Sequence, residues 1–228
     1  DILALNWSTL KHMQRSALRC RHRMDHPQPE TQALGFGTFV HCMLLEPDAV
    51  FARYAIYADR RAGKVWEAWE AEHTGIVAVK PDEWADAEAM VRAVLAHDRA
   101  AELLRGGRPE SSMQWRDPDH GVPCKGRVDY ITPAWIIDVK GIDSGQWSNY
   151  GLASQAGRLL YHGQLAWYHD GAIAAGLLPA EAPLPWVVFV EKAPRGEEPG
   201  SYAHDVACRQ LDIESYEGGR RLYRDLLA

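Results

Sequence analysis

The sequence predicts a single α/β domain in which helices flank a mixed β-sheet. Two observations carry this prediction: apolar residues recur at helical spacing in the N-terminal part, and β-forming residues broken by turns follow between residues 110 and 139. A length of 228 residues is ordinary for one well-packed domain. No internal repeat or low-complexity linker divides the chain. We therefore expect one domain over residues 1–228, with a helical part over about 1–108 and a sheet-containing part over about 109–228.

Helices are expected through the first half of the chain. Ser8 could cap a helix over residues 9–18, and a proline-containing loop follows at residues 26–33. The stretch "LGFGTFVHCMLLEP" predicts a helix that is entered through glycines, carries His41 and stops before Pro47.

The next segment is mixed in character. It begins like a strand at Tyr54, continues as a basic loop, "DRRAGK", and becomes helical at "VWEAWEAEH". A long helix is then expected over residues 81–104, because acidic residues occupy its first turn and apolar residues recur at helical spacing.

Strands dominate the second half of the chain. Three antiparallel strands are expected over residues 110–115, 123–131 and 134–139, with turns at "DPDHG" and "TP". A helix over about 152–175 should end at Gly176. Two more strands in "LPWVVFVEKA" and "YAHDVACRQL", and a final helix in "IESYEGGRRLYRDLLA" interrupted at its glycine pair, complete the α/β pattern.

Two of these strands bring charged side chains to one face. If the hairpin turns at its Thr–Pro pair, Asp129 lies opposite Ile136, and residues 136, 138 and 140 alternate onto the same face. Asp129, Asp138 and Lys140 should therefore converge. A slip of one residue in the pairing would move Asp129 to the opposite face.

Two carboxylates beside an ammonium suit metal-assisted hydrolysis. Such oxygens bind Mg²⁺ or Mn²⁺, and Lys140 could orient a metal-bound water or neutralise developing charge. A salt bridge between neighbouring strands is the alternative interpretation. On the following helix, Gln164 and Tyr168 share a face, whereas Tyr161 fits a buried aromatic stripe. His41 alone would more often be a core histidine than a ligand.

The composition disfavours several classes of protein. A net charge of −6 argues against binding nucleic acid through overall charge, although local basic clusters could offset it. The four cysteines are widely spaced, which disfavours zinc and iron–sulfur sites and favours reduced thiols in a cytosolic protein. The first residues do not resemble a signal peptide, no apolar run is long enough for a transmembrane helix, and no membrane partner is expected.

Several motifs, taken in their order along the chain, resemble one family. They are GTxxHxxxLEP around His41, the acidic Glu110, C-K-x-R-x-D ending at Asp129, I-I-D-x-K ending at Lys140, and Y-H-x-Q-x-A-x-Y ending at Tyr168. This set resembles the PD-(D/E)XK nuclease superfamily, specifically the exonuclease VIII (RecE-type) domain of phages and prophages. It is similar, more distantly, to RecB-type nuclease domains and λ exonuclease. The resemblance spans nearly the whole chain and implies a restriction-endonuclease-like core with a central mixed sheet flanked by helices.

The resemblance also implies a role for each matching residue. The metal ligands of the family are matched by His41, Asp129, Asp138 and the backbone carbonyl of Val139, and its catalytic lysine is matched by Lys140. Gln164 and Tyr168 match a motif that supports the site and contacts DNA. Glu110 matches an acidic residue that would serve a second ion. Gly141 departs from the pattern, because most relatives place Thr or Ser after the lysine. The candidate phosphate contacts are Arg60, Arg61, Lys64, Lys125 and Arg127.

The implied activity is a Mg²⁺-dependent exonuclease, with Mn²⁺ able to substitute, that degrades linear double-stranded DNA from its ends. The implied direction is 5′ to 3′, leaving single-stranded DNA for recombination by strand annealing. A ring-like homo-oligomer, a RecT-like annealing protein as partner, and a phage or prophage origin in the cytoplasm of a bacterial host are implied as well. The alternatives are a non-catalytic DNA-binding or assembly module that kept the fold, and a metal-dependent hydrolase of small substrates.

Overall fold

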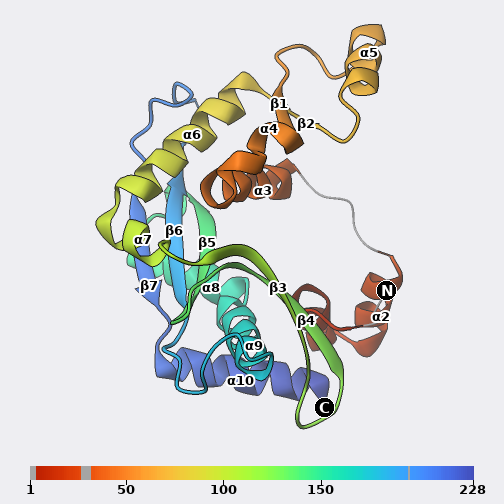
Figure 1. Cartoon of the computed structure of the whole chain (residues 1–228), viewed down its shortest axis with the longest axis vertical. Helices are drawn as coiled ribbons and strands as arrows, with labels where there is room; N and C mark the ends of the chain where they lie inside the picture. Colours follow the sequence, from red (N-terminus) through yellow and green to blue (C-terminus); the bar gives the residue numbers. More distant parts are fainter. Residues whose placement is uncertain (1–3, 27–31, 195) are drawn as a thin grey trace.

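A five-stranded mixed sheet forms the centre of the computed structural model, which describes residues 4–26, 32–194 and 196–228. The strands lie in the order β3–β4–β5–β6–β7, and Figure 1 shows helices on both sides of them. Their bounds are Arg108–Arg116 for β3, Pro123–Ile131 for β4, Ile136–Asp143 for β5, Trp186–Lys192 for β6 and Val206–Gln210 for β7. Only β5 and β6 run parallel within this described sheet. The expected α/β fold is confirmed.

A helical crossover makes β5 and β6 parallel. After the 3₁₀ turn η3 (Ser144–Gln146), α8 (Asn149–Arg158) and α9 (Tyr161–Ala174) carry the chain across one face of the sheet. The prediction of one helix over residues 152–175 was wrong, because Leu160 adopts a left-handed conformation with φ of 59°. Leucine is a good helix former, so composition gives no sign of this break. Gly176 ends the crossover as expected, with φ of 70°.

Helices α3 (Gln32–Leu45) and α6 (Pro81–Ala96) cover the opposite face of the sheet. Phe39 and Met90 pack there against Val139 and Val188 in one buried cluster. The expected helix over residues 81–104 is divided at His97, whose side chain accepts a hydrogen bond from the backbone N–H of Ala100 and caps α7 (Asp98–Leu103).

The N-terminal segment contains three short elements instead of one helix. They are α1 (Trp7–Leu10), the 3₁₀ turn η1 (Lys11–Gln14) and α2 (Ala17–Asp25). Asn6 caps α1 and Ser16 caps α2, so the predicted cap at Ser8 and helix over residues 9–18 were wrong. Two caps ten residues apart divide the segment. Of the loop expected at residues 26–33, residues 27–31 lie outside the described part, and α3 begins at Gln32.

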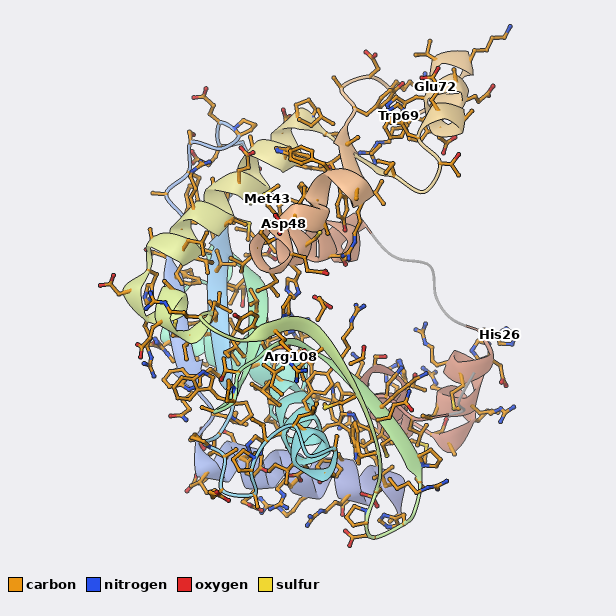
Figure 2. All side chains as sticks on the ribbon, in the orientation of Figure 1. His26, Met43, Asp48, Trp69, Glu72 and Arg108 are labelled. Atoms are coloured by element: carbon orange, nitrogen blue, oxygen red, sulfur yellow. The ribbon has the colours of Figure 1, made fainter. Side chains whose placement is uncertain are left out.

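A small lobe stands apart from the main sheet. It follows the turn η2 (Pro47–Ala49) and α4 (Val50–Arg53), and contains the parallel strands β1 (Tyr54–Ile56) and β2 (Val77–Val79) with α5 (Lys64–Glu72) between them. The strand-like start at Tyr54, the basic loop and the helix agree with the sequence, whereas β2 was not expected. Figure 2 shows Trp69 and Glu72 of α5 at the end of the molecule away from Arg108 of β3.

The hairpin between β4 and β5 has a longer turn than expected. Ile131 pairs with Ile136, and Thr132 closes the turn by donating its backbone N–H to the carbonyl of Trp135. The expected pairing of Asp129 with Ile136 was therefore wrong by two residues. Since side chains alternate with a period of two, a two-residue shift leaves Asp129 on the expected face.

The final helix, α10 (Ile213–Leu227), is continuous through its glycine pair, contrary to the expected interruption. A Cβ atom at Gly219 would overlap the carbonyl oxygen of His162 on α9. This glycine permits close packing of α10 on α9 and does not break the helix. Among the described residues, no helix combines the length and apolar character needed to cross a membrane.

Candidate active site

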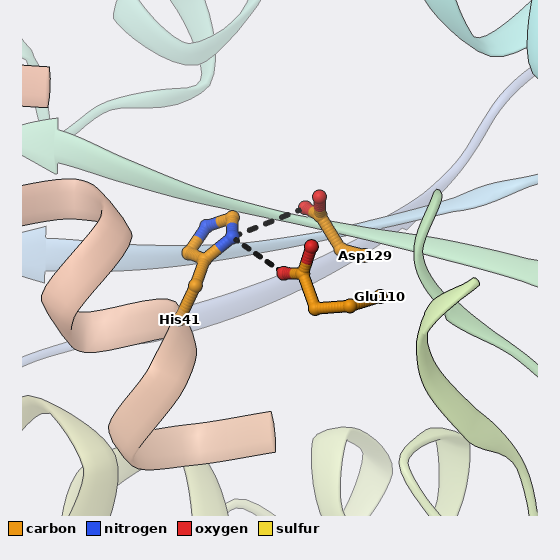
Figure 3. Close-up of side chains that lie close together, drawn as sticks. All are labelled: His41, Glu110 and Asp129. Atoms are coloured by element: carbon orange, nitrogen blue, oxygen red, sulfur yellow. Dashed lines mark ion pairs between the residues drawn. The ribbon is translucent and has the colours of Figure 1, made fainter. Parts of the chain in front are cut away.

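His41 projects from α3 toward the sheet and touches three of the expected site residues. Its Nε2 lies 3.0 Å from the carbonyl oxygen of Val139. Its Nδ1 lies 3.7 Å from Oδ2 of Asp129 and 4.0 Å from Oε1 of Glu110, as Figure 3 shows. A carbonyl accepts hydrogen bonds and cannot donate them, so Nε2 is the donor. Nδ1 of His41 faces two carboxylates, an arrangement that a cation bound among them would stabilise.

Asp129 and Glu110 come from adjacent strands, β4 and β3. Oδ2 of Asp129 accepts a hydrogen bond from the backbone N–H of Val139 at 2.8 Å. Burial opposes ionisation of Asp129, but His41, Lys140 and this hydrogen bond hold its pKa below the usual range. Asp129 therefore stays a carboxylate and can serve as an anionic ligand.

Glu110 has an unusual backbone for its residue type. Its φ of 44° lies in the left-handed region, which non-glycine residues adopt only at a cost in energy. Burial raises its pKa, with a further contribution from Asp129, and Arg127 opposes this shift from 2.9 Å away. The strained backbone directs the carboxylate toward His41 and Asp129.

Asp138 and Lys140 form a buried ion pair next to this cluster. Nζ of Lys140 lies 2.7 Å from Oδ2 of Asp138, which is only 1% exposed. Burial, reinforced by Asp129, raises the pKa of Asp138 to about 6 despite the nearby ammonium. Burial also opposes the charge of Lys140, but the two aspartates outweigh it and raise the lysine pKa. Lys140 is therefore charged at neutral pH.

The donor atoms fit a hard divalent cation. Nδ1 of His41 and one carboxylate oxygen each from Glu110 and Asp129 lie within 4.8 Å of one another. Among the described residues, Oδ1 of Asp138 is buried without a hydrogen-bond partner, so a cation could satisfy it. Carboxylate and imidazole donors suit Mg²⁺ or Mn²⁺. Glu110 joins the close group of three, whereas Asp138 lies outside it and is paired with Lys140.

Gln164 and Tyr168 meet on α9 beside the same cleft. Nε2 of Gln164 donates to the hydroxyl of Tyr168 at 3.4 Å. The Tyr168 ring packs so closely over Gly126 of β4 that a Cβ there would lie 3.0 Å from it. Tyr168 therefore lines the cleft from a fixed position.

The site opens into a cleft of about 790 Å³ between the N-terminal segment, α3 and strands β3 to β5. Two expected phosphate contacts, Lys125 and Arg127, line it. Arg60, Arg61 and Lys64 belong to the small lobe and are not among its lining residues. Arg61 instead donates to the carbonyl of Ala78 at 2.7 Å. The structure thus brings together only part of the proposed basic set.

The residues that surround Lys140 and hold it in place were not predicted from the sequence. Its Nζ lies 5.4 Å from the centre of the Tyr161 ring, a cation–π distance. Nε2 of Gln155 donates to the hydroxyl of Tyr161 at 3.1 Å and to the carbonyl of Gly141 at 3.4 Å. The break at Leu160 separates Gln155 from Tyr161, so helical periodicity could not pair them. Gly141 leaves room for the side chain of Lys192, which a Cβ would approach to 2.8 Å.

Comparisons with known proteins agree with this fold. A family model described as "PDDEXK-like domain of unknown function (DUF3799)" matches residues 6–176, a range that includes the cleft residues from His41 to Tyr168. A crystal structure from Eubacterium rectale, described as a "Putative exonuclease", superposes with a TM-score of 0.66 at 12% identity, covering 97% of this chain and 77% of that chain. No curated protein matches the sequence. At this identity the structural likeness shows the fold alone.

Proposed function

The chain belongs to the family of PDDEXK-like domains, within the PD-(D/E)XK superfamily, and from this membership and its cleft we propose that it is a metal-dependent nuclease that hydrolyses DNA phosphodiester bonds. One observation carries the proposal. The group of His41, Glu110 and Asp129 lies beside the buried ion pair of Asp138 and Lys140, and all five residues fall within the matched range.

The residues of the close group and of the buried ion pair have different tasks in this proposal. His41, Glu110 and Asp129 would hold a divalent ion, with Asp138 beside them. The carbonyl of Val139, which was expected to be a ligand, instead accepts a hydrogen bond from Nε2 of His41, on the side of the ring away from this group. Such an ion acidifies its bound water and stabilises negative charge on a phosphoryl oxygen. The raised pKa of Lys140 makes it a hydrogen-bond donor and a fixed positive charge, and so a poor general base.

Several features favour a polymeric substrate over a small one. The cleft is open to solvent, and Lys125 and Arg127 line it. Phosphate groups on both sides of a cleaved bond would pair with such residues, whereas a small phosphate ester would leave much of the cleft unfilled. We therefore propose a nucleic acid as the substrate, and DNA in particular because the motifs resemble those of a DNA exonuclease.

The finer proposal rests on the resemblance of the motifs to RecE-type exonucleases. In it, the enzyme uses Mg²⁺, or Mn²⁺ in its place, to degrade linear double-stranded DNA from its ends in the 5′ to 3′ direction. The single strand would then serve recombination with a RecT-like annealing protein in a bacterial cytoplasm. A ring-like homo-oligomer of a phage or prophage protein is part of this proposal.

Digestion of end-labelled DNA tests both the proposed nuclease activity and the proposed 5′ to 3′ direction. Linear duplex labelled at the 5′ or the 3′ end is incubated with Mg²⁺, with EDTA, or with the Lys140→Ala variant. We expect metal-dependent release of nucleotides, with the rate reduced by about 10²–10³ in the variant because a fixed positive charge is lost. Covalently closed circular DNA should remain intact if cleavage requires ends. Equal, background-level release by wild type and variant would refute the nuclease proposal, and early release of the 3′ label alone would reverse the direction.

A further inference from the structure

The N-terminal segment is strongly basic in an acidic protein. Seven of the thirteen residues from Lys11 to Arg23 are Lys, Arg or His, and none is acidic, while the whole chain has a net charge of −6. Charges of opposite sign are usually interspersed on a solvated surface. This concentration of positive charge therefore indicates a surface that binds an anionic partner.

The segment is fixed in place beside the cleft. The backbone N–H of Leu5 donates to the carbonyl of Pro123 at 2.9 Å, and the N–H of Lys125 donates to the carbonyl of Leu5 at 2.8 Å. Trp7 and Leu10 are buried in the cluster that also contains Trp167. Figure 1 shows α2 and α3 on the same side of the β3–β4 hairpin, with α9 and α10 on its other side. Asn6, Trp7 and Ser8 line the cleft, so the start of the segment forms part of its wall, and the basic residues from Lys11 onward extend this wall beyond the lining residues.

The basic side chains of this wall differ in whether an acidic side chain pairs with them. Among the described residues, no ion pair joins Lys11, Arg15, Arg19 or Arg23 to a carboxylate, in contrast to Arg21, which pairs with Asp25 at 2.9 Å.

The basic groups of the wall lie close enough to affect one another's pKa values, and Lys140 of the site affects one of them. Burial lowers the pKa of His12, and Arg23, Lys11, Arg15 and Arg19 lower it further. Burial likewise lowers the pKa of Lys11, with Lys140 as the next cause. Lys11 therefore lies near enough to Lys140 for the two charges to interact, and the basic residues extend from there to α2.

We propose that Lys11, Arg15, Arg19 and Arg23 form a basic wall that binds the phosphodiester backbone of DNA flanking the cleaved bond. This inference deepens the proposed nuclease function and rests on it. Arg19 and Arg23 are four residues apart and share one face of α2, whereas Arg21 points to another side. Contacts of this kind position the duplex without reading its sequence.

Salt-dependent binding tests the wall independently of cleavage. A fluorescent linear duplex is titrated in EDTA between about 50 and 200 mM salt, and the slope of log K against log salt is measured by anisotropy. For Arg19→Gln/Arg23→Gln we expect weaker binding and a slope shallower by about 1.8, since each lost phosphate contact removes about 0.9. The matched control is Arg21→Gln, which should retain the wild-type slope because Arg21 is already paired with Asp25.

An Arg19→Lys/Arg23→Lys variant keeps the charge and should bind with the wild-type slope, which separates loss of charge from misfolding. A double Gln variant with the wild-type slope would overturn the wall, as would an equal loss in Arg21→Gln. If the wild type cleaves DNA but the double Gln variant has the same salt slope as the wild type, the proposed basic wall is wrong and the nuclease proposal remains. If the wild type binds no duplex and cleaves none, both fail.

Discussion

At the scale of single residues, the position of Lys140 depends on the aromatic ring beneath it. Replacing Tyr161 with Leu removes the cation–π contact, which is worth about 1–2 kcal/mol in a desolvated site, and should lower kcat about tenfold with little change in KM. Tyr161→Phe keeps the ring and should retain most of the activity. Steady-state kinetics on linear duplex would measure both, with Tyr150→Leu, at an 84% exposed position, as control. A Leu variant with wild-type kcat would exclude this role.

The residues of the site were predictable from the sequence to different degrees. Strand alternation is insensitive to a two-residue shift, so Asp129, Asp138 and Lys140 could be placed on one face despite the wrong pairing. The contribution of Glu110 to the close group depends on a left-handed backbone that its residue type disfavours, and no local pattern announces that. Gln155 reaches Gly141 only through the tertiary fold.

At the scale of elements, the cap of α10 is a pH-sensitive stabilising contact. The backbone N–H and the hydroxyl of Ser215 both donate hydrogen bonds to the carboxylate of Asp212. These bonds lower the pKa of Asp212, the backbone bond more than the hydroxyl bond. A lowered carboxyl pKa contributes stability above the unfolded value of about 3.9, and this contribution is lost as pH falls through the folded value. Asp212→Ala should cost about 1 kcal/mol near neutral pH and progressively less in acid.

Urea unfolding at a series of pH values would measure this change. Asp212→Asn is the matched control, since asparagine caps a helix about as well as aspartate but does not titrate. It should have nearly wild-type stability at neutral pH and should lack the part of the acid loss that Asp212 causes. A constant difference between wild type and Asp212→Ala at all pH values would contradict the assigned contact.

The boundaries of elements were less predictable than their existence. The helices expected over residues 81–104 and 152–175 are divided at His97 and at Leu160, which precede α7 and α9, and neither residue type is a preferred N-cap. At the glycine pair of α10 the sequence predicted a break that the structure does not have. Gly219 allows close packing with α9, and the helix continues through it. The cap at His97 and the left-handed backbone at Leu160 are local features, whereas Gly219 packs against a distant helix, and the spacing of apolar residues predicts none of the three.

At the scale of the whole molecule, the site joins parts of the chain that are distant in sequence. His41 comes from α3, while Glu110 and Asp129 come from β3 and β4, and the acids face one another and the imidazole across the interface of α3 with the sheet. Folding must bring these groups together against the repulsion of the carboxylates. A cation bound among them would therefore stabilise the native arrangement of α3 on the sheet and would have no equivalent site in the unfolded chain.

Metal binding should accordingly raise the melting temperature. At a Mg²⁺ concentration about a hundred times its Kd, linkage predicts about 2.7 kcal/mol of stabilisation, or about 5–10 °C for a domain of this size. Differential scanning fluorimetry with Mg²⁺ and with EDTA would measure the shift. Asp129→Asn should abolish most of it, whereas Glu102→Gln, which alters an exposed carboxylate paired with Arg99, should keep it. A wild type that responds to neither Mg²⁺ nor Mn²⁺, or an Asp129→Asn variant that responds as fully as the wild type, would show that these donors do not hold the ion. Because this readout requires no DNA, it tests the metal site even if the substrate proposal fails.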